Sequence, residues 1–114
     1  MADTRKTAAI IGGGVIGSGW ATRFLLNGWD VRFFDPSDDA ERVLHAVIER
    51  GREAMPALCD VVPEEGTLTI ASSTADAVAG AIYIQESTPE RIEVKRAVLK
   101  TIQADCDADA IVAS

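Results

Sequence analysis

Long apolar runs are missing from this sequence of 114 residues. No run approaches the roughly 20 residues that a membrane-spanning helix needs, so we expect no membrane span. The N-terminus, Met-Ala-Asp-Thr-Arg-Lys, is too polar and too short to lead a signal peptide. Acidic residues outnumber basic ones, so the formal net charge is -7 at pH 7. This charge argues against a nucleic-acid-binding surface and against binding to anionic lipid.

Cysteine and histidine are scarce as well. Cys59 and Cys106 are isolated, without C-x-x-C spacing or a secretion signal, so we expect two free thiols in a cytoplasmic protein. His45 is the only histidine, and no suitably spaced cysteine accompanies it, so a metal role is not expected. The acidic stretch 105–109 lacks the glycine and the distal glutamate of a calcium loop.

The sequence does contain a glycine motif in an informative setting. Gly12, Gly14 and Gly17 form G-x-G-x-x-G between an apolar strand, residues 7–11, and a predicted helix. The first glycine permits a tight turn, the second lets the backbone approach a pyrophosphate, and the third lets helix and strand pack closely. The helix N-terminus offers free N–H groups to the phosphates. The candidate pyrophosphate-binding residues are Gly12, Gly13, Gly14, Val15, Ile16 and Gly17.

An acidic residue follows at the expected distance. Asp35 ends a second apolar run, about 20 residues beyond the glycines, where a carboxylate meets the adenosine ribose of NAD. No basic residue follows before Arg42, so nothing nearby would neutralise a 2′-phosphate, and we expect NAD rather than NADP. The competing interpretation is that Asp35 begins a turn and caps the next helix. Three glycines and an acid in register favour the cofactor interpretation.

The alternation of elements predicts the fold. Helices are expected at about 15–27, 37–55, 75–79 and 89–104, between strands at 7–11, 30–34, 67–71, 81–85 and 110–114. This order predicts an α/β protein with a doubly wound parallel sheet, a Rossmann domain that spans residues 1–114 and stops after its fifth strand.

Apolar spacing and capping residues refine two of these helices. In the first, Ile16, Trp20 and Phe24 recur at helical spacing with Ala21 and Leu25 beside them, which predicts the face that packs inward. Gly28 is placed to end this helix. In the second, Ser37 is the expected N-cap.

With these motifs, the segment after the fourth strand gives the chain a family resemblance. Glu86, Glu90 and Lys95 fill the pattern E-x-x-x-E-x-x-x-x-K, and the sequence resembles the 3-hydroxyacyl-CoA dehydrogenase family over essentially its whole length. The form Gln-Glu-Ser-x-Pro-Glu-Arg is most similar to the branch that oxidises carnitine, and next to the branch that oxidises L-gulonate.

The resemblance implies NAD-dependent oxidation of a 3-hydroxy group, in a carnitine-like acid or a 3-hydroxyacyl-CoA. It also implies that Glu90 and Lys95 line the NAD site. From spacing alone, Glu90 would complement a helix N-terminus and Lys95 would be a solvated lysine. Glu86 lies where α/β sheets bind ligands, or it anchors the following turn.

The family's catalytic residues lie beyond the equivalent of Ser114, so no catalytic residue is assigned. We therefore expect the amino-terminal cofactor part of a longer dehydrogenase that acts on a small-molecule substrate, and a homodimer in the full-length form. A non-catalytic dinucleotide-binding or sensing module is the alternative, because no general base presents itself. A flavoprotein fits the opening motif, but the segment from Glu86 to Lys95 argues against it.

Overall fold

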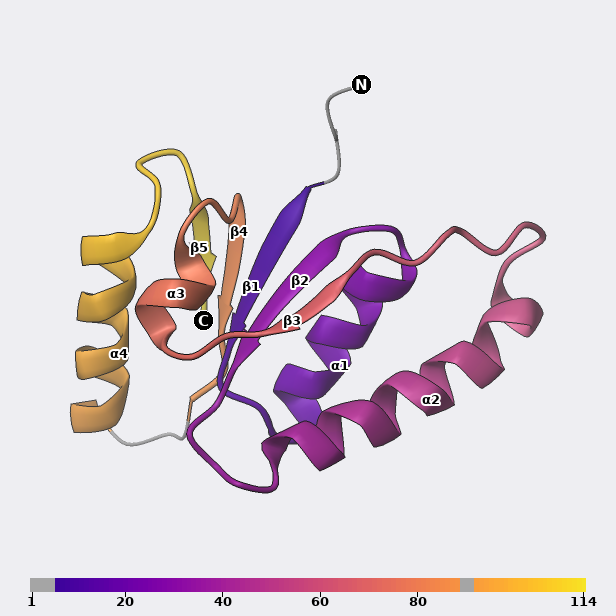
Figure 1. Ribbon diagram of the computed structural model, residues 1–114, viewed down its shortest axis with the longest axis horizontal. Coiled ribbons are helices and arrows are strands. Elements are labelled where there is room, and N and C mark those ends of the chain that lie inside the picture. Colours follow the sequence, from indigo (N-terminus) through magenta and orange to yellow (C-terminus); the bar gives the residue numbers. More distant parts are fainter. Residues whose placement is uncertain (1–5, 89–91) are drawn as a thin grey trace.

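The computed structural model describes residues 6–88 and 92–114. In this part of the chain a parallel sheet of five strands has the order β3-β2-β1-β4-β5. The strands are β1 (Thr7–Ile11), β2 (Asp30–Phe34), β3 (Leu68–Ile70), β4 (Tyr83–Glu86) and β5 (Ile111–Ala113). The helices are α1 (Gly14–Leu26), α2 (Ala40–Leu58), α3 (Thr74–Val78) and α4 (Ile92–Asp105). The predicted doubly wound α/β fold is confirmed (Figure 1).

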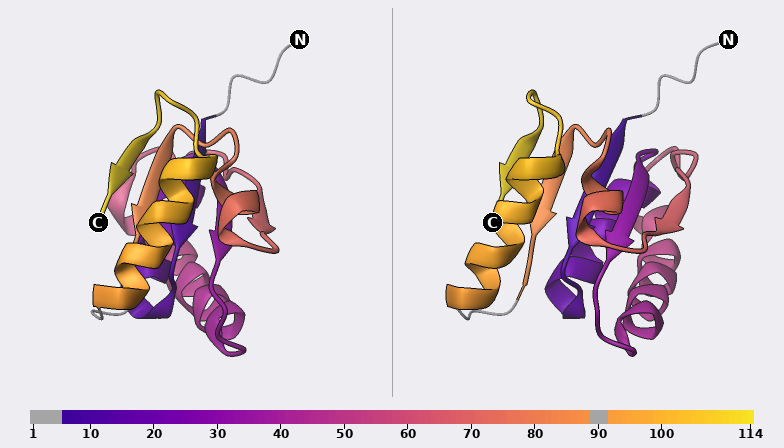
Figure 2. Two further views of the ribbon diagram at one scale, coloured as in Figure 1. Left: turned by 90° about the vertical axis from the view of Figure 1, so that its left-hand side faces the viewer. Right: turned by 60° about the vertical axis from the view of Figure 1, so that its left-hand side comes forward.

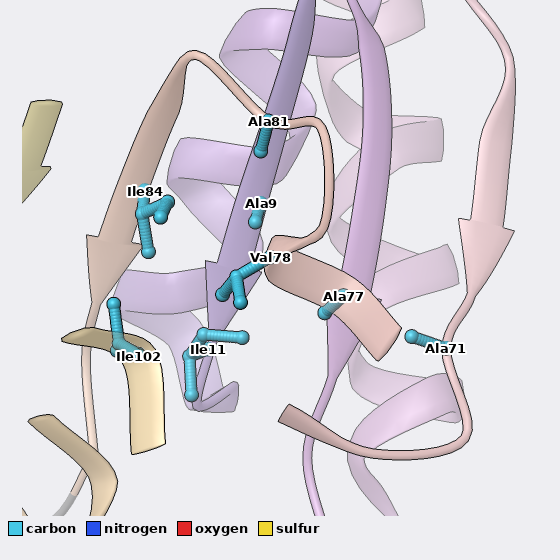
Figure 3. Packing of buried hydrophobic residues seen from close by; sticks show 8 residues of the cluster. All are labelled: Ala9, Ile11, Ala71, Ala77, Val78, Ala81, Ile84 and Ile102. Carbon is cyan, nitrogen blue, oxygen red and sulfur yellow. The ribbon is translucent and has the colours of Figure 1, made fainter. Parts of the chain in front are cut away.

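Each face of the sheet is covered by one pair of helices. α1 and α2 pack on one face, and α3 and α4 lie on the other (Figures 1 and 2). Successive residues of β1 point to opposite faces, so Ile10 belongs to the α1–α2 core and Ile11 to the α3–α4 core. Figure 3 shows the second core, in which Ile84 of β4 and Ile102 of α4 are both fully buried.

The inward face of α1 agrees with the prediction only in part. Ala21 and Leu25 are buried as expected, together with Gly17, whereas Ile16 is 73% exposed and Trp20 is 36% exposed. The small side chains of Gly17 and Ala21 allow α1 to pack closely, and Ile16 and Trp20 lie on its exposed flank. Phe24 packs against the α1–α2 core and contacts Tyr83, with ring centroids 5.1 Å apart. The first helix ends before Gly28, as predicted.

The predicted bounds of α2 were also wrong at both ends. Ser37 is not the N-cap, because its carbonyl accepts the amide of Ala40 in a turn and the helix begins only at Ala40. At the other end α2 continues through Pro56, and the Cys59 amide donates to the Met55 carbonyl. Pro56 has no amide hydrogen, so the last turn of α2 lacks the backbone hydrogen bond that this position would otherwise donate.

The other bounds agree to within a few residues, apart from the predicted start of the fourth helix, which lies outside the described residues. β4 is shifted towards the C-terminus relative to the prediction, so Glu86 lies inside the strand at its end. In α3 the hydroxyl of Ser73 accepts the amide of Asp76 as an N-cap. Within residues 6–88 and 92–114, no helix is both long enough and apolar enough to cross a membrane.

Candidate functional site

An open cleft of about 880 Å³ lies at the carboxyl ends of β1, β4 and β5. From β1 the chain turns to β2 on one side, and it later returns to β4 on the other side. Ligands of open α/β sheets bind at such a switch point. The cleft is lined by Gly13, Gly14, Val15, Ile16, Trp20, Gln85, Glu86, Ser87, Thr88, Lys95 and Ser114.

Two glycines of the motif are required by close backbone contacts. Gly12 has φ +91°, and a Cβ on it would lie 2.6 Å from the carbonyl carbon of Ser87. A Cβ on Gly17 would lie 2.1 Å from the Gly12 carbonyl oxygen. Gly17 therefore has the packing role that the motif predicts. Gly12 brings the turn after β1 against the backbone that follows β4, a contact between distant segments that the motif alone does not reveal.

Gly14 faces open space in the cleft. It has φ +68°, and a Cβ on it would meet nothing within 4 Å. α1 begins here without a capping side chain, and its first turn holds no acidic residue. The first amides of a helix lack intrahelical acceptors and carry the positive end of the helix dipole. This donor set fits a pyrophosphate.

Asp35 is held against the glycine turn. Its Oδ2 accepts the amide of Gly13 at 2.5 Å, and its Oδ1 accepts the amide of Ser37 at 2.7 Å. Asp35 thus does begin a turn, and the same carboxylate reaches the turn after β1. Arg42, the first basic residue after Asp35, donates a hydrogen bond from Nε to the carboxylate of Asp39 at 2.8 Å. The hydrogen bond and the positive charge of Arg42 lower the pKa of Asp39.

Glu86 forms a buried polar network at the end of β4. Its Oε2 accepts the Thr88 amide at 2.7 Å and the Thr88 hydroxyl. Its Oε1 accepts the Lys95 ammonium at 2.9 Å and the Ser114 hydroxyl at 2.6 Å. Burial alone would raise the pKa of Glu86, but the hydrogen bonds from Ser114, Thr88 and Lys95 outweigh it and lower the pKa to about 2.

The structure brings most of the predicted site residues to one edge. Lys95 lies in the cleft, and its side chain is 25% exposed. Glu90 lies outside the described residues. Glu86 is among the residues that line the cleft, and its carboxylate also anchors the following turn by accepting the Thr88 amide. Sequence reasoning missed the contribution of Ser114 to this network and that of Trp20 to the cleft wall.

Cys59, Cys106 and His45 are not among the residues that line the cleft. The described part of the chain contains no group of three or more His, Cys, Asp or Glu residues that could hold a metal ion. Cys59 and Cys106 are free thiols, as expected. His45 is exposed on α2.

The parallel sheet, the glycine turn with its open helix N-terminus and the acid after β2 define a dinucleotide-binding domain. Among such domains, the chain belongs to the family described as 3-hydroxyacyl-CoA dehydrogenase, NAD binding domain, whose sequence model matches residues 7–114.

Two relatives show how this chain compares in length with longer proteins. The L-carnitine dehydrogenase/betainyl-CoA thioesterase of Ruegeria pomeroyi is 54% identical over 109 residues, which cover 95% of this chain and 22% of the relative. The L-carnitine dehydrogenase of Mesorhizobium japonicum is 50% identical over 108 residues, which cover 94% of this chain and 30% of the relative. This chain spans less than a third of either relative.

Solved structures share the fold. A 5-formyl-3-hydroxy-2-methylpyridine 4-carboxylic acid 5-dehydrogenase, described as an NAD+ dependent dismutase, has a TM-score of 0.81 and 31% identity, covering 96% of this chain and 36% of the other. The (S)-3-hydroxybutyryl-CoA dehydrogenase of Ralstonia eutropha has a TM-score of 0.73 and 20% identity, covering 96% of this chain and 40% of the other. At that lower identity, the likeness shows the fold alone.

Proposed function

We propose that this chain is the NAD-binding part of an oxidoreductase that converts a 3-hydroxy group into the 3-oxo product. One observation carries the proposal: the open N-terminus of α1 and the carboxylate of Asp35 meet at the same glycine turn. A pyrophosphate and an adenosine ribose need that pairing of amide donors with a carboxylate acceptor. Membership of the family supports NAD as the dinucleotide.

In this proposal each site residue has a distinct role. Gly14, Val15 and Ile16 offer backbone amides to the pyrophosphate, and the turn at Gly12, Gly13 and Gly17 gives them their position. Asp35 accepts hydrogen bonds from the ribose hydroxyls and repels a 2′-phosphate. Lys95 and, from the sequence pattern, Glu90 line the cofactor site.

The substrate proposed first is a carnitine-like 3-hydroxy acid, because two similar relatives are named L-carnitine dehydrogenase. A 3-hydroxyacyl-CoA is the second, because it is the substrate in the family's name. NAD, when bound, accepts the hydride of the alcohol carbon. The alcohol proton needs a base. Since His45 is exposed on α2 and is not among the residues that line the cleft, we assign the base to residues outside this chain. We also propose a cytoplasmic location and, for a full-length enzyme, a homodimer.

A comparison of NADH and NADPH tests the cofactor assignment. Each would be titrated against the 114-residue chain and followed by nicotinamide fluorescence, with circular dichroism to verify folding. We expect NADH to bind at least about tenfold more tightly, a difference of about 1.4 kcal/mol. Equal affinities, or no binding of NADH by a folded chain, would contradict the proposal.

A further inference from the structure

We infer that Glu86 is a positioning residue of the cofactor cleft, which holds the Lys95 ammonium and the segment after β4 in the geometry that the cofactor meets. This inference rests on the proposed function, because it concerns how that cleft is built. It assigns Glu86 no contact with the cofactor.

The contacts of Glu86 reach three separate elements. Through Oε2 it holds Thr88, directly after its own strand. Through Oε1 it holds Lys95 of α4 at 2.9 Å and Ser114, after β5, at 2.6 Å. Lys95 and Ser114 also lie 3.3 Å apart, Nζ to Oγ. One carboxylate therefore joins α4 and the ends of two neighbouring strands.

Burial separates the roles of the two charged residues. The side chain of Glu86 has no exposed surface, whereas that of Lys95 is 25% exposed and lines the cleft. A ligand in the cleft can therefore meet the ammonium of Lys95, while the carboxylate stays behind it. A lysine side chain is long and flexible, and a fixed carboxylate partner removes much of that freedom before the ligand arrives.

The second arm of Glu86 supports the glycine turn. The amide of Ser87 donates to the carbonyl of Ile11 at 2.7 Å, and a Cβ on Gly12 would lie 2.7 Å from the amide nitrogen of Thr88. The backbone at 87–88 is thus one wall against which the turn after β1 rests. By binding Thr88, Glu86 fixes that wall and Lys95 with the same side chain.

A double-mutant cycle on NADH affinity tests whether Glu86 acts through Lys95. The four proteins are the 114-residue chain and its Glu86→Gln, Lys95→Met and doubly substituted forms. Glutamine keeps an oxygen acceptor for Thr88 but loses the charge that binds Lys95. We expect each single substitution to raise the Kd of NADH about tenfold, and the double substitution to raise it about tenfold as well.

Matched variants separate this effect from a loss of folding. Glu65 forms an ion pair outside the cleft, in which Arg52 Nη2 lies 2.9 Å from Glu65 Oε1. Glu65→Gln removes this carboxylate charge and should leave the Kd of NADH unchanged. Folding of every variant is verified by circular dichroism before titration. If Glu86→Gln does not fold, Glu86→Asp replaces it in the cycle. Aspartate keeps the charge but is one methylene too short to hold both Thr88 and Lys95.

Each outcome of the cycle decides the inference. A double variant about a hundredfold weaker would mean that Glu86 and Lys95 act independently, which overturns it. An unchanged Kd in either single variant, with the parent chain binding NADH, overturns it too. Failure of the folded parent chain to bind NADH would contradict the proposed function itself, which keeps the two failures distinct.

Discussion

Asp35 and Gly13 are joined by a hydrogen bond in which the glycine amide donates to Oδ2 of the carboxylate at 2.5 Å. The bond connects the residue that follows β2 to the turn after β1. Each carboxylate oxygen has a second lone pair, so this bond leaves acceptor capacity for a ribose hydroxyl. Asp35 thus shapes the turn as well as offering an acceptor beside it.

Replacement of Asp35 should separate these two roles. Asp35→Ala removes both, so we expect NADH binding to weaken by about 1–3 kcal/mol and the chain to lose stability. Asp35→Asn keeps an oxygen for the Gly13 amide but removes the charge that repels a 2′-phosphate. It should therefore retain more stability than the alanine variant and discriminate less between NADH and NADPH. Isothermal titration and urea unfolding measure both effects.

The opposite pattern would contradict this assignment. If Asp35→Asn and the parent chain discriminate equally between NADH and NADPH, the charge of Asp35 does not select the cofactor. If Asp35→Ala binds NADH as tightly as the parent chain, Asp35 is not part of the site.

Two glycines of the motif should respond in opposite ways to a side chain. Gly14→Val should keep the fold, with about 1–2 kcal/mol of backbone strain at φ +68°, and lose NADH binding because its methyl groups occupy the phosphate position. Gly17→Ala should instead destabilise the chain by about 1–3 kcal/mol or more, because its Cβ would lie 2.1 Å from the Gly12 carbonyl oxygen.

Thermal unfolding and NADH titration of the two glycine variants distinguish them. A Gly14→Val chain that folds and still binds NADH would place the pyrophosphate elsewhere. A Gly17→Ala chain as stable as the parent would mean that α1 and β1 can separate without cost.

Much of the fold could be predicted because its signals are local. The apolar strands, the glycine turn and Gly28 specify β1, α1 and β2 through residues that are close in the chain. The inward face of α1 could be predicted in this way only in part. Hydrophobic spacing identifies Leu25, which is buried, but it also selects Ile16, which is exposed because the close packing of the helix buries Gly17 instead.

The site shows the same division between local and distant contacts. The motif identifies the glycines and Asp35, which lie within one βαβ unit. The network at Glu86 depends on the pairing of β4 with β5 and on the packing of α4, which together bring Lys95 and Ser114 to one carboxylate. The pattern E-x-x-x-E-x-x-x-x-K contains Glu86 and Lys95, but it does not indicate that their side chains meet or that Ser114 joins them.

The packing of α4 gives a prediction about stability. Ile102 is fully buried against Ile84 and its neighbours (Figure 3), so Ile102→Ala should lower the free energy of unfolding by about 2–5 kcal/mol. Val94 lies on the same helix but is 37% exposed, so Val94→Ala is the matched control, with an expected change of about 0.5 kcal/mol. Urea unfolding compares them, and equal losses would contradict the burial of Ile102.

Glu86 should make the stability of the chain depend on acidity. Its pKa is about 2 in the folded protein and near the usual 4.5 when unfolded, so the folded state favours the ionised form. The resulting stabilisation, about 3 kcal/mol, is fully present above pH 4.5 and is lost as the pH falls from 4.5 towards 2. Glu86→Gln cannot titrate and isolates this contribution from that of other carboxylates.

Urea unfolding at pH 6 and pH 3 measures the effect. Between these two pH values the parent chain should lose about 2 kcal/mol more stability than Glu86→Gln. The loss is smaller than the full stabilisation because Glu86 of the folded chain is still mostly ionised at pH 3. Parallel losses in the two proteins would mean that Glu86 has the same pKa in the folded and unfolded chains. The hydrogen bonds from Thr88, Lys95 and Ser114 would then do no more than offset the burial of the carboxylate.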